Sequence, residues 1–300
     1  MHTATSDNNA ASDNYQLGTG GLHAGTVAGL EVGWARIPIP LSNRIGGTAV
    51  AGDKVYLAHE DGSVQRVHPT TGTVESTVVI TGRQLGQLAV VGGRMYLRTW
   101  NDSRTRSYLA AYTPAGVMRW EAELTDEVVS PFVVGGGLVL ATAGPQCQDV
   151  CVGFELRAFR ADTGMIAWRA PVDGDAYSFA GPVIIGDTVV QAAYGPVGDG
   201  ADTLAFGYRL SSGVRRWVKV TPGFDAAGWG GRTFLSGYEG ICSYTTGTGA
   251  DRWCVKRTGQ YFDELAFGPG ALYVDGPDQE IISLVPDTGA ERWRRSYDRG

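Results

Sequence analysis

The chain has 300 residues, a formal net charge of −6 and a pI near 5.3, so its charge gives no reason to expect nucleic-acid binding. Hydrophobic residues make up 43% of the chain and charged residues only 19%, which argues against a disordered protein. No apolar run is long enough to span a bilayer, so we expect no transmembrane segment.

Residues 1–27 are polar, and we predict that they form a flexible segment before a single domain over residues 28–300. The start of the chain lacks the basic and apolar regions of a signal peptide. No cysteine lies near it either, so a lipid anchor is not expected.

One pattern then repeats along the chain, in which a glycine is followed four positions later by a tryptophan. Its five copies are Gly116–Trp120, Gly164–Trp168, Gly213–Trp217, Gly249–Trp253 and Gly289–Trp293. Gly72–Ser76 keeps the spacing without the tryptophan, and Trp34 is preceded by a displaced glycine. The steps between the anchor positions run from 36 to 49 residues. A period of this length, built from short strands, predicts a propeller or a repeat array.

Each repeat contains the same order of strands and turns. In the repeat that ends at residue 172 we expect strands at 128–134, 138–143, 155–161 and 165–172. Gly-Gly, Gly-Asp or Pro-Gly pairs separate the first two strands of every repeat, as tight hairpins require. Four antiparallel strands per unit predict the blade of an all-β propeller.

Six such blades fit between about residue 48 and residue 297, and the strand around Trp34 is left over. This pattern allows a seven-bladed ring with an incomplete blade. It also allows a six-bladed ring with an extra N-terminal strand. We favour the seven-bladed ring.

Four cysteines form two local pairs in the sequence, Cys147 with Cys151 and Cys242 with Cys254. The second pair lies on what we expect to be neighbouring strands of one hairpin. We predict two disulfides and an oxidising compartment, with four free buried thiols as the alternative.

Residues 158–168 and 283–293 resemble the A-x-D-x-x-T-G-x-x-x-W repeat of quinoprotein-type (PQQ-like) β-propellers, including their BamB-like branch. The resemblance covers about residues 28–298. It implies that the tryptophans pack flat on the neighbouring blade as structural anchors. These anchors are Trp34, Trp120, Trp168, Trp217, Trp253 and Trp293.

The resemblance also implies that the loops leading into each first strand share one face with the loops between second and third strands. Polar and aromatic side chains of the leading loops are therefore candidate binding residues at the channel mouth. They are Arg44, Arg83, Gln84, Asp126, Glu127, Asp175, Tyr177, Asp225, Tyr261, Asp263 and Glu264, with Phe224 and Phe262 as further aromatic walls. The alternative is that these are the solvated, charged loops of any soluble propeller.

Three of the loops between second and third strands are long, at residues 99–106, 143–154 and 193–203. Long loops on consecutive blades suggest a recognition surface, and neutral insertion is the alternative.

We therefore predict a secreted or periplasmic, non-catalytic, monomeric propeller that binds a protein or peptide, with no cofactor and no metal site. The alternative is an enzyme at the channel mouth, either a PQQ- and Ca²⁺-dependent dehydrogenase or a lyase or hydrolase. Its carboxylates would be Asp225, Asp263 and Glu264, with Arg44 or Arg83 stabilising charge. The vicinal cysteines of the larger alcohol dehydrogenases are missing. A sensor domain of a longer polypeptide is a third possibility.

Overall fold

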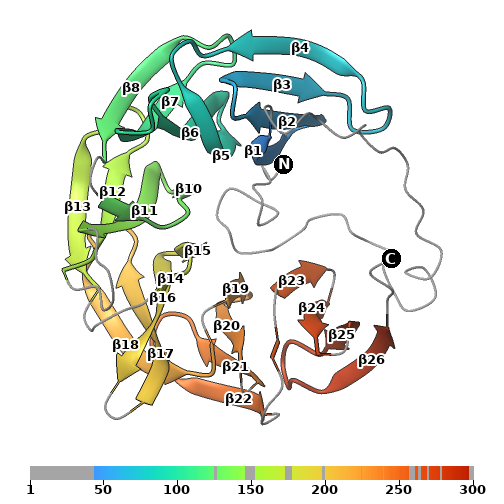
Figure 1. The fold of residues 1–300 in the computed structure, drawn as a ribbon. Helices are drawn as coiled ribbons and strands as arrows, with labels where there is room; N and C mark the ends of the chain where they lie inside the picture. Colours follow the sequence, from blue (N-terminus) through green and yellow to red (C-terminus); the bar gives the residue numbers. More distant parts are fainter. Residues whose placement is uncertain are drawn as a thin grey trace.

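A computed structural model describes residues 44–124, 127–145, 153–172, 178–197, 200–223, 225–238, 240–256, 261–262, 265–268, 270–277 and 279–296. Throughout this part of the chain the regular structure is β-strand, arranged as six antiparallel sheets. Figure 1 shows the sheets placed round a centre, with the first strand of each sheet innermost and the fourth at the rim. The predicted all-β propeller of four-stranded blades is confirmed.

The first three blades follow one another in chain order. Blade 1 contains β1 (Ile45–Ala51), β2 (Lys54–His59), β3 (Ser63–Val67) and β4 (Val74–Val79). Blade 2 contains β5 (Gln84–Val91), β6 (Arg94–Trp100), β7 (Ser107–Tyr112) and β8 (Met118–Glu123). Blade 3 contains β9 (Glu127–Val129), β10 (Val133–Gly135), β11 (Leu138–Pro145), β12 (Glu155–Arg160) and β13 (Ile166–Pro171).

The other three blades continue the series. Blade 4 contains β14 (Ser178–Phe179), β15 (Val183–Ile185), β16 (Thr188–Val197), β17 (Gly200–Arg209) and β18 (Arg215–Thr221). Blade 5 contains β19 (Asp225–Trp229), β20 (Arg232–Gly237), β21 (Gly240–Thr245) and β22 (Asp251–Lys256). Blade 6 contains β23 (Leu265–Gly268), β24 (Ala271–Gly276), β25 (Glu280–Leu284) and β26 (Glu291–Ser296).

The innermost strands of blades 3 and 4 are interrupted, whereas a continuous strand was predicted over residues 128–134. β9 and β10 both pair with β11 but are separated by Ser130, Pro131 and Phe132. A proline has no N–H to donate to a strand ladder, so the strand breaks there. Pro182 stands at the matching break between β14 and β15.

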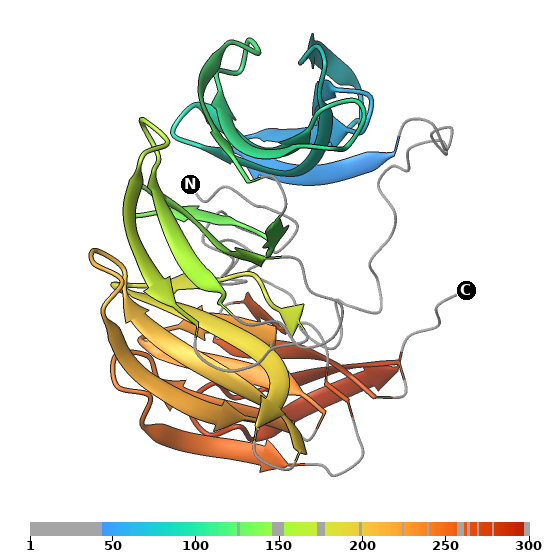
Figure 2. The same cartoon turned by 60° about the vertical axis from the view of Figure 1, so that its left-hand side comes forward.

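The long loop predicted at residues 193–203 is largely a β-hairpin. β16 and β17 stay paired out to Val197 and Gly200, so only residues 198 and 199, outside the described part, connect them. Blade 4 therefore extends two long strands where a loop was expected. Figure 2, turned by 60°, shows neighbouring blades as twisted sheets that follow one another round the ring.

Apolar clusters join each blade to the next. Five clusters fill the junctions between blades 1 and 2, 2 and 3, 3 and 4, 4 and 5, and 5 and 6, each drawing side chains from both sheets. Within the described residues, no such cluster joins blade 6 to blade 1. The strand predicted around Trp34 lies outside the described residues, so the choice between six and seven blades stays a prediction.

At four of these junctions a tryptophan of the fourth strand reaches the next blade. Its indole N–H donates a hydrogen bond to a backbone carbonyl three residues before the repeat glycine. The pairs are Trp120 with Ala161 (3.0 Å), Trp168 with Leu210 (2.9 Å), Trp217 with Thr246 (2.7 Å) and Trp253 with Pro286 (3.0 Å). Blade 1 has Ser76 at this position, and its Val78 instead lies against Gly116 of blade 2.

The repeat glycine is needed for two reasons. Gly164 has a φ of +71°, which side chains rarely adopt, and a Cβ there would lie 2.5 Å from Cε3 of Trp120. Any larger residue would therefore strain the backbone and push the indole away from the carbonyl that it reaches.

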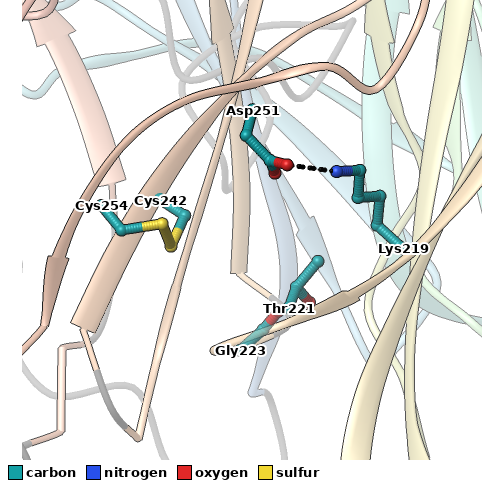
Figure 3. Close-up of a disulfide and its surroundings, with 6 residues drawn as sticks. All are labelled: Lys219, Thr221, Gly223, Cys242, Asp251 and Cys254. Atoms are coloured by element: carbon teal, nitrogen blue, oxygen red, sulfur yellow. Dashed lines mark hydrogen bonds and ion pairs between the residues drawn. A yellow bond between two sulfur atoms is a disulfide. The ribbon is translucent and has the colours of Figure 1, made fainter.

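A disulfide links the two outer strands of blade 5. Cys242 in β21 and Cys254 in β22 are direct partners in the strand register and are bonded to each other (Figure 3). Lys219 of blade 4 forms an ion pair with Asp251 of the same hairpin, at 2.7 Å. In the same view, Thr221 donates a hydrogen bond to the carbonyl of Gly223. Cys147 and Cys151 lie outside the described residues.

Candidate binding site

Strand register brings the predicted loops to one face. In blade 2, Gln84 at the start of β5 is paired with Trp100 at the end of β6, which is paired with Ser107 at the start of β7. The loops that lead into first strands therefore share this face with the loops between second and third strands. We call it the loop-rich face. The opposite face carries the short turns between first and second and between third and fourth strands, and we call it the turn face.

The loop between β6 and β7 is held by its own polar side chains. The Asn101 side chain accepts a hydrogen bond from the Arg106 amide (2.9 Å) and donates to the hydroxyls of Ser103 (3.0 Å) and Thr105 (2.9 Å). A loop that satisfies its backbone in this way can keep a defined shape without an apolar core of its own.

This loop is also tied to its surroundings. Gln84 donates a hydrogen bond to the carbonyl of Asp102 (3.0 Å) and accepts one from Nε of Arg104. Arg104 in turn lies 3.3 Å from the carboxylate of Glu60, in the second-to-third-strand turn of blade 1. The predicted candidate Gln84 thus helps to order a surface loop across the junction of two blades.

Two guanidinium groups lie over one aromatic ring beside this loop. Arg98 and Arg104 are 5.0 and 5.9 Å from the ring centroid of Trp100, within the range of cation–π attraction. Burial lowers the pKa of Arg98. Trp100 was not among the predicted candidates. Its position at the end of a second strand, just before a long loop, was the available signal.

Arg83 points toward the outer strands of its own blade. Its guanidinium forms two hydrogen bonds with the Glu121 carboxylate on β8 (2.8 and 3.0 Å) and lies 4.4 Å from the ring centroid of Tyr108 on β7. Partial burial acts to lower the pKa of Arg83, but the hydrogen bond to Glu121 and the charge interactions with Glu121, Tyr112 and Tyr108 together raise it. Arg44 is exposed, and its carbonyl accepts the Glu60 amide (2.8 Å). A binding role for either arginine stays a prediction.

Asp225 takes part in the contact between blades 5 and 6. Its carboxylate accepts a hydrogen bond from the backbone amide of Leu265, 2.9 Å away on the neighbouring innermost strand. Asp225, which the sequence analysis named as a candidate carboxylate for binding or catalysis, therefore also links two blades.

Two glutamines play a similar part that the sequence analysis did not single out. Gln87 exchanges two hydrogen bonds with the backbone of Phe132, across blades 2 and 3. Gln191 accepts from Thr142 of blade 3 and donates to the carbonyl of Ala180 at the break in its own first strand. Each is a polar residue within a mainly apolar strand, and that was the signal available in the sequence.

An aromatic pair is exposed on the loop-rich face of blades 5 and 6. The rings of Tyr238 and Tyr261 meet edge to face with centroids 4.8 Å apart, and 61% and 38% of these residues are exposed. Next to them Phe262 is 2% exposed and its amide donates to Gly237, so Phe262 is a core residue and not the aromatic wall that was predicted. Burial of Phe262 directs its neighbour Tyr261 outward.

Several predicted residues cannot be placed. Asp126, Asp175, Tyr177, Phe224, Asp263 and Glu264 lie outside the described residues, and Glu127 begins β9.

The part of the chain that the structure describes offers no group of three or more His, Cys, Asp or Glu side chains able to hold a metal ion. A quinone–calcium site needs carboxylate and amide ligands. Gln87 and Asp225 on first strands and Gln191 on the second strand of blade 4 are hydrogen-bonded to neighbouring strands. These three side chains are therefore engaged in contacts within the protein. The described chain contains no helix that could cross a membrane.

The fold and its junctions place the protein among the β-propellers built from PQQ-like repeats. The chain belongs to the family described as outer membrane protein assembly factor BamB, whose model matches residues 60–223 and 155–300. The resemblance inferred from the repeat is thereby confirmed.

Solved structures of the same fold include BamB and an alcohol dehydrogenase. BamB from Moraxella catarrhalis has a TM-score of 0.58 at 14% identity, over 82% of this chain and 74% of that one. Quinohemoprotein alcohol dehydrogenase from Comamonas testosteroni has a TM-score of 0.54 at 11% identity, over 83% and 59%. At such identities the likeness shows the fold alone.

Curated relatives match parts of this chain. Epithelial discoidin domain-containing receptor 1 of Rattus norvegicus is 27% identical over 217 residues, covering 64% of this chain and 23% of the receptor. Serine/threonine-protein kinase AfsK of Streptomyces griseus is 31% identical over 161 residues, covering 49% of this chain and 20% of the kinase. The chain thus spans less than a quarter of the length of either relative.

Proposed function

We propose that this protein is an extracytoplasmic, non-catalytic propeller that binds a protein or peptide partner through its loop-rich face. The observation that carries the proposal is the exposed Tyr238–Tyr261 pair. Tyrosine presents a large, rigid contact area with a polar tip, and aromatic residues are enriched where proteins bind one another. Two such rings in contact form a ready anchor point.

The surroundings of the pair suit a binding surface. Tyr238 lies just before β21, which the Cys242–Cys254 disulfide joins to β22. A surface held in one shape loses less conformational entropy when a partner binds. The disulfide also supports an extracytoplasmic location, because such bonds persist in oxidising compartments.

The comparisons favour binding over catalysis. The matched family is described as an assembly factor, and two relatives that contain a similar segment are named as a receptor and a kinase. A propeller segment within a longer receptor or kinase is expected to serve as a recognition module. We expect a monomer that requires no cofactor.

The partner is expected to carry basic side chains that meet the acidic loops of blades 3 and 6. The residues concerned are Asp126, Glu127, Asp263 and Glu264. Reversing the charge at Asp263 and Glu264 should weaken capture of the partner without lowering the melting temperature. Unchanged capture would show that these loops are only solvated.

The principal test uses the protein as immobilised bait for extracts of its own source. A partner captured by the wild type should bind the Tyr238→Ser/Tyr261→Ser variant at least about tenfold more weakly, since aromatic anchors dominate interface energies. Val79→Ser, which changes an exposed side chain of blade 1, is the matched control. Equal capture by all three proteins would reject the loop-rich face as the binding surface.

A second measurement addresses the enzyme alternative. Native mass spectrometry in the presence of PQQ and Ca²⁺ should show the bare monomer. A stoichiometric quinone complex would replace the proposal with a dehydrogenase.

A further inference from the structure

A pocket lies on the turn face, away from the candidate binding site. It encloses about 570 Å³ and is formed where blades 2, 3 and 4 meet. Arg94 of blade 2, Arg160 and Asp162 of blade 3, and Ser211 of blade 4 line it, and each belongs to, or directly borders, a turn of this face.

Arg94 is held in place by a neutral acceptor. One nitrogen of its guanidinium donates to the carbonyl of Ala161 at 3.1 Å, an oxygen that also accepts Trp120 (3.0 Å) and Tyr96 (3.2 Å). Because the acceptor is neutral, the positive charge of Arg94 is not compensated there.

Arg160 adds a second uncompensated charge. Among the described residues, no carboxylate lies within ion-pair distance of Arg94 or Arg160. Elsewhere on the turn face, arginines at similar turns are neutralised. Arg232 pairs with Asp287 across blades 5 and 6, and Arg216 pairs with Asp187 within blade 4. Two guanidinium groups and one carboxylate, Asp162, leave the pocket with a net positive charge.

Large apolar side chains are exposed on turns of the three blades that form the pocket. Val117, Met165 and Val214 directly follow the repeat glycines of blades 2, 3 and 4 and are 58%, 66% and 61% exposed. Blades 5 and 6 have only alanine at this position, Ala250 and Ala290. Met165 is two residues from Ala167 in the pocket wall, and Val214 is three residues from Ser211. The three blades that form the pocket therefore each carry an exposed apolar side chain on the turn that follows their third strand.

We propose that this pocket is a second binding site, which takes an extended peptide segment carrying a carboxylate beside apolar side chains. The carboxylate would pair with Arg94 and Arg160, and the apolar side chains would lie on Met165 and Val214. Asp162 would accept a backbone N–H of the same segment. A guanidinium pair favours a carboxylate because it presents several donors in a fixed planar geometry. This site is separate from the loop-rich face and does not depend on its function.

The test is a selection from a displayed library of random twelve-residue peptides. This length is used so that each peptide is longer than the pocket. Peptides that bind the Arg160→Glu/Met165→Ser variant are removed first, and the remaining peptides are selected for binding to the wild type. Synthetic copies of the selected peptides are then titrated with each protein, and binding is measured by fluorescence anisotropy. The selected peptides should contain Asp or Glu next to large apolar residues. They should bind the double variant at least about tenfold more weakly than the wild type.

Matched variants complete the test. Arg292→Glu/Val79→Ser changes an exposed arginine and an exposed valine on other blades and should bind like the wild type. Tyr238→Ser/Tyr261→Ser should also bind normally, which separates this site from the proposed function. Arg94→Gln should weaken binding, with folding checked by thermal melting. A selection that yields no Arg160-dependent peptide, or peptides without a carboxylate, would overturn the proposal.

Discussion

The junction between blades 2 and 3 and that between blades 5 and 6 share their main elements but use their polar groups differently. Both have an arginine after a Gly-Gly turn, a fourth-strand tryptophan, and an Asp-Thr-Gly turn on the following blade. In both, the tryptophan donates to a carbonyl of that turn at 3.0 Å. Only the junction of blades 5 and 6 adds a direct ion pair, between Arg232 and Asp287.

At the junction of blades 2 and 3 the arginine has another partner. Tyr96 stands where blade 5 has Phe234, and its hydroxyl joins Arg94 and Trp120 in donating to the Ala161 carbonyl. Asp162, which corresponds to Asp287, has no ion pair among the described residues. The difference teaches that the apolar and glycine positions of the repeat build the scaffold, while its charged positions can either close a junction or remain available for a ligand.

The largest expected effect concerns the shared tryptophan. Trp120→Ala should lower the free energy of unfolding by about 3–5 kcal/mol, because it removes a buried indole and leaves the Ala161 carbonyl with fewer donors. Trp253→Ala should cost less, because Trp253 is only partly buried. Urea unfolding of both variants gives the comparison. Equal losses would contradict the difference in packing.

The disulfide strengthens the side of the molecule that contains blade 5. Replacing both Cys242 and Cys254 by alanine should lower the free energy of unfolding by about 2–4 kcal/mol, since the bond closes a loop with a sequence separation of 12. Urea unfolding of both proteins under non-reducing conditions measures this loss. If reduction of the wild type has no effect on the urea midpoint, the bond does not stabilise the fold.

A pair of glycine variants isolates the contact with Trp120. Gly137 and Gly164 have similar φ values of +76° and +71°, but only a Cβ at Gly164 would meet a ring. Gly137→Ala should therefore show the backbone cost alone, about 1–2 kcal/mol. Gly164→Ala should lose about 1–3 kcal/mol more through overpacking. Thermal unfolding measures the difference. Equal melting temperatures for the two variants would disprove the close contact between position 164 and Trp120.

A smaller difference in stability is expected between variants of Asp287 and Asp162, the two aspartates at corresponding positions of the compared junctions. Asp287→Asn should reduce the free energy of unfolding by at most about 1 kcal/mol, because the ion pair with Arg232 is partly exposed. Asp162→Asn should leave it unchanged. The urea midpoints of the two variants test this, and a larger loss in Asp162→Asn would mean that its carboxylate also closes its junction.

The last prediction concerns pH. The hydrogen bond from Arg216 lowers the pKa of Asp187 to about 2. A depressed carboxyl pKa adds stability above the unfolded pKa of about 4, and this stability is lost as the pH falls toward 2. Asp187→Asn should therefore show a slightly weaker dependence of melting temperature on pH in this range. If the melting temperatures of the wild type and of Asp187→Asn change with pH in the same way, the Asp187–Arg216 pair does not contribute to stability.

The sequence predicts the scaffold well because its signals are local and repeated. The hairpin turns and short strands recur in six blades and the tryptophan spacing in five, so each blade is specified by its own residues. The break at Pro131 was readable in principle from the missing N–H of proline. The extension of β16 and β17 was not, because the glycine-rich stretch from Gly195 to Gly200 looks like a loop.

The candidate site was harder to predict for a physical reason. A polar residue in a loop can face solvent or the next blade, and the sequence does not distinguish the two. Arg83 and Asp225 have partners within the protein, while Tyr261 is exposed. Its neighbour Phe262, of nearly the same character, is in the core. Such outcomes depend on how two blades pack, which no single repeat encodes.

Hydrogen–deuterium exchange of the protein alone and saturated with its captured partner tests most directly whether the loop-rich face binds. We predict slower exchange at residues 236–242 and 101–106, around the Tyr238–Tyr261 pair and the ordered loop of blade 2, with little change in the outer strands β13 and β18. Slower exchange confined to the outer strands, with the loop-rich face unchanged, would contradict the account.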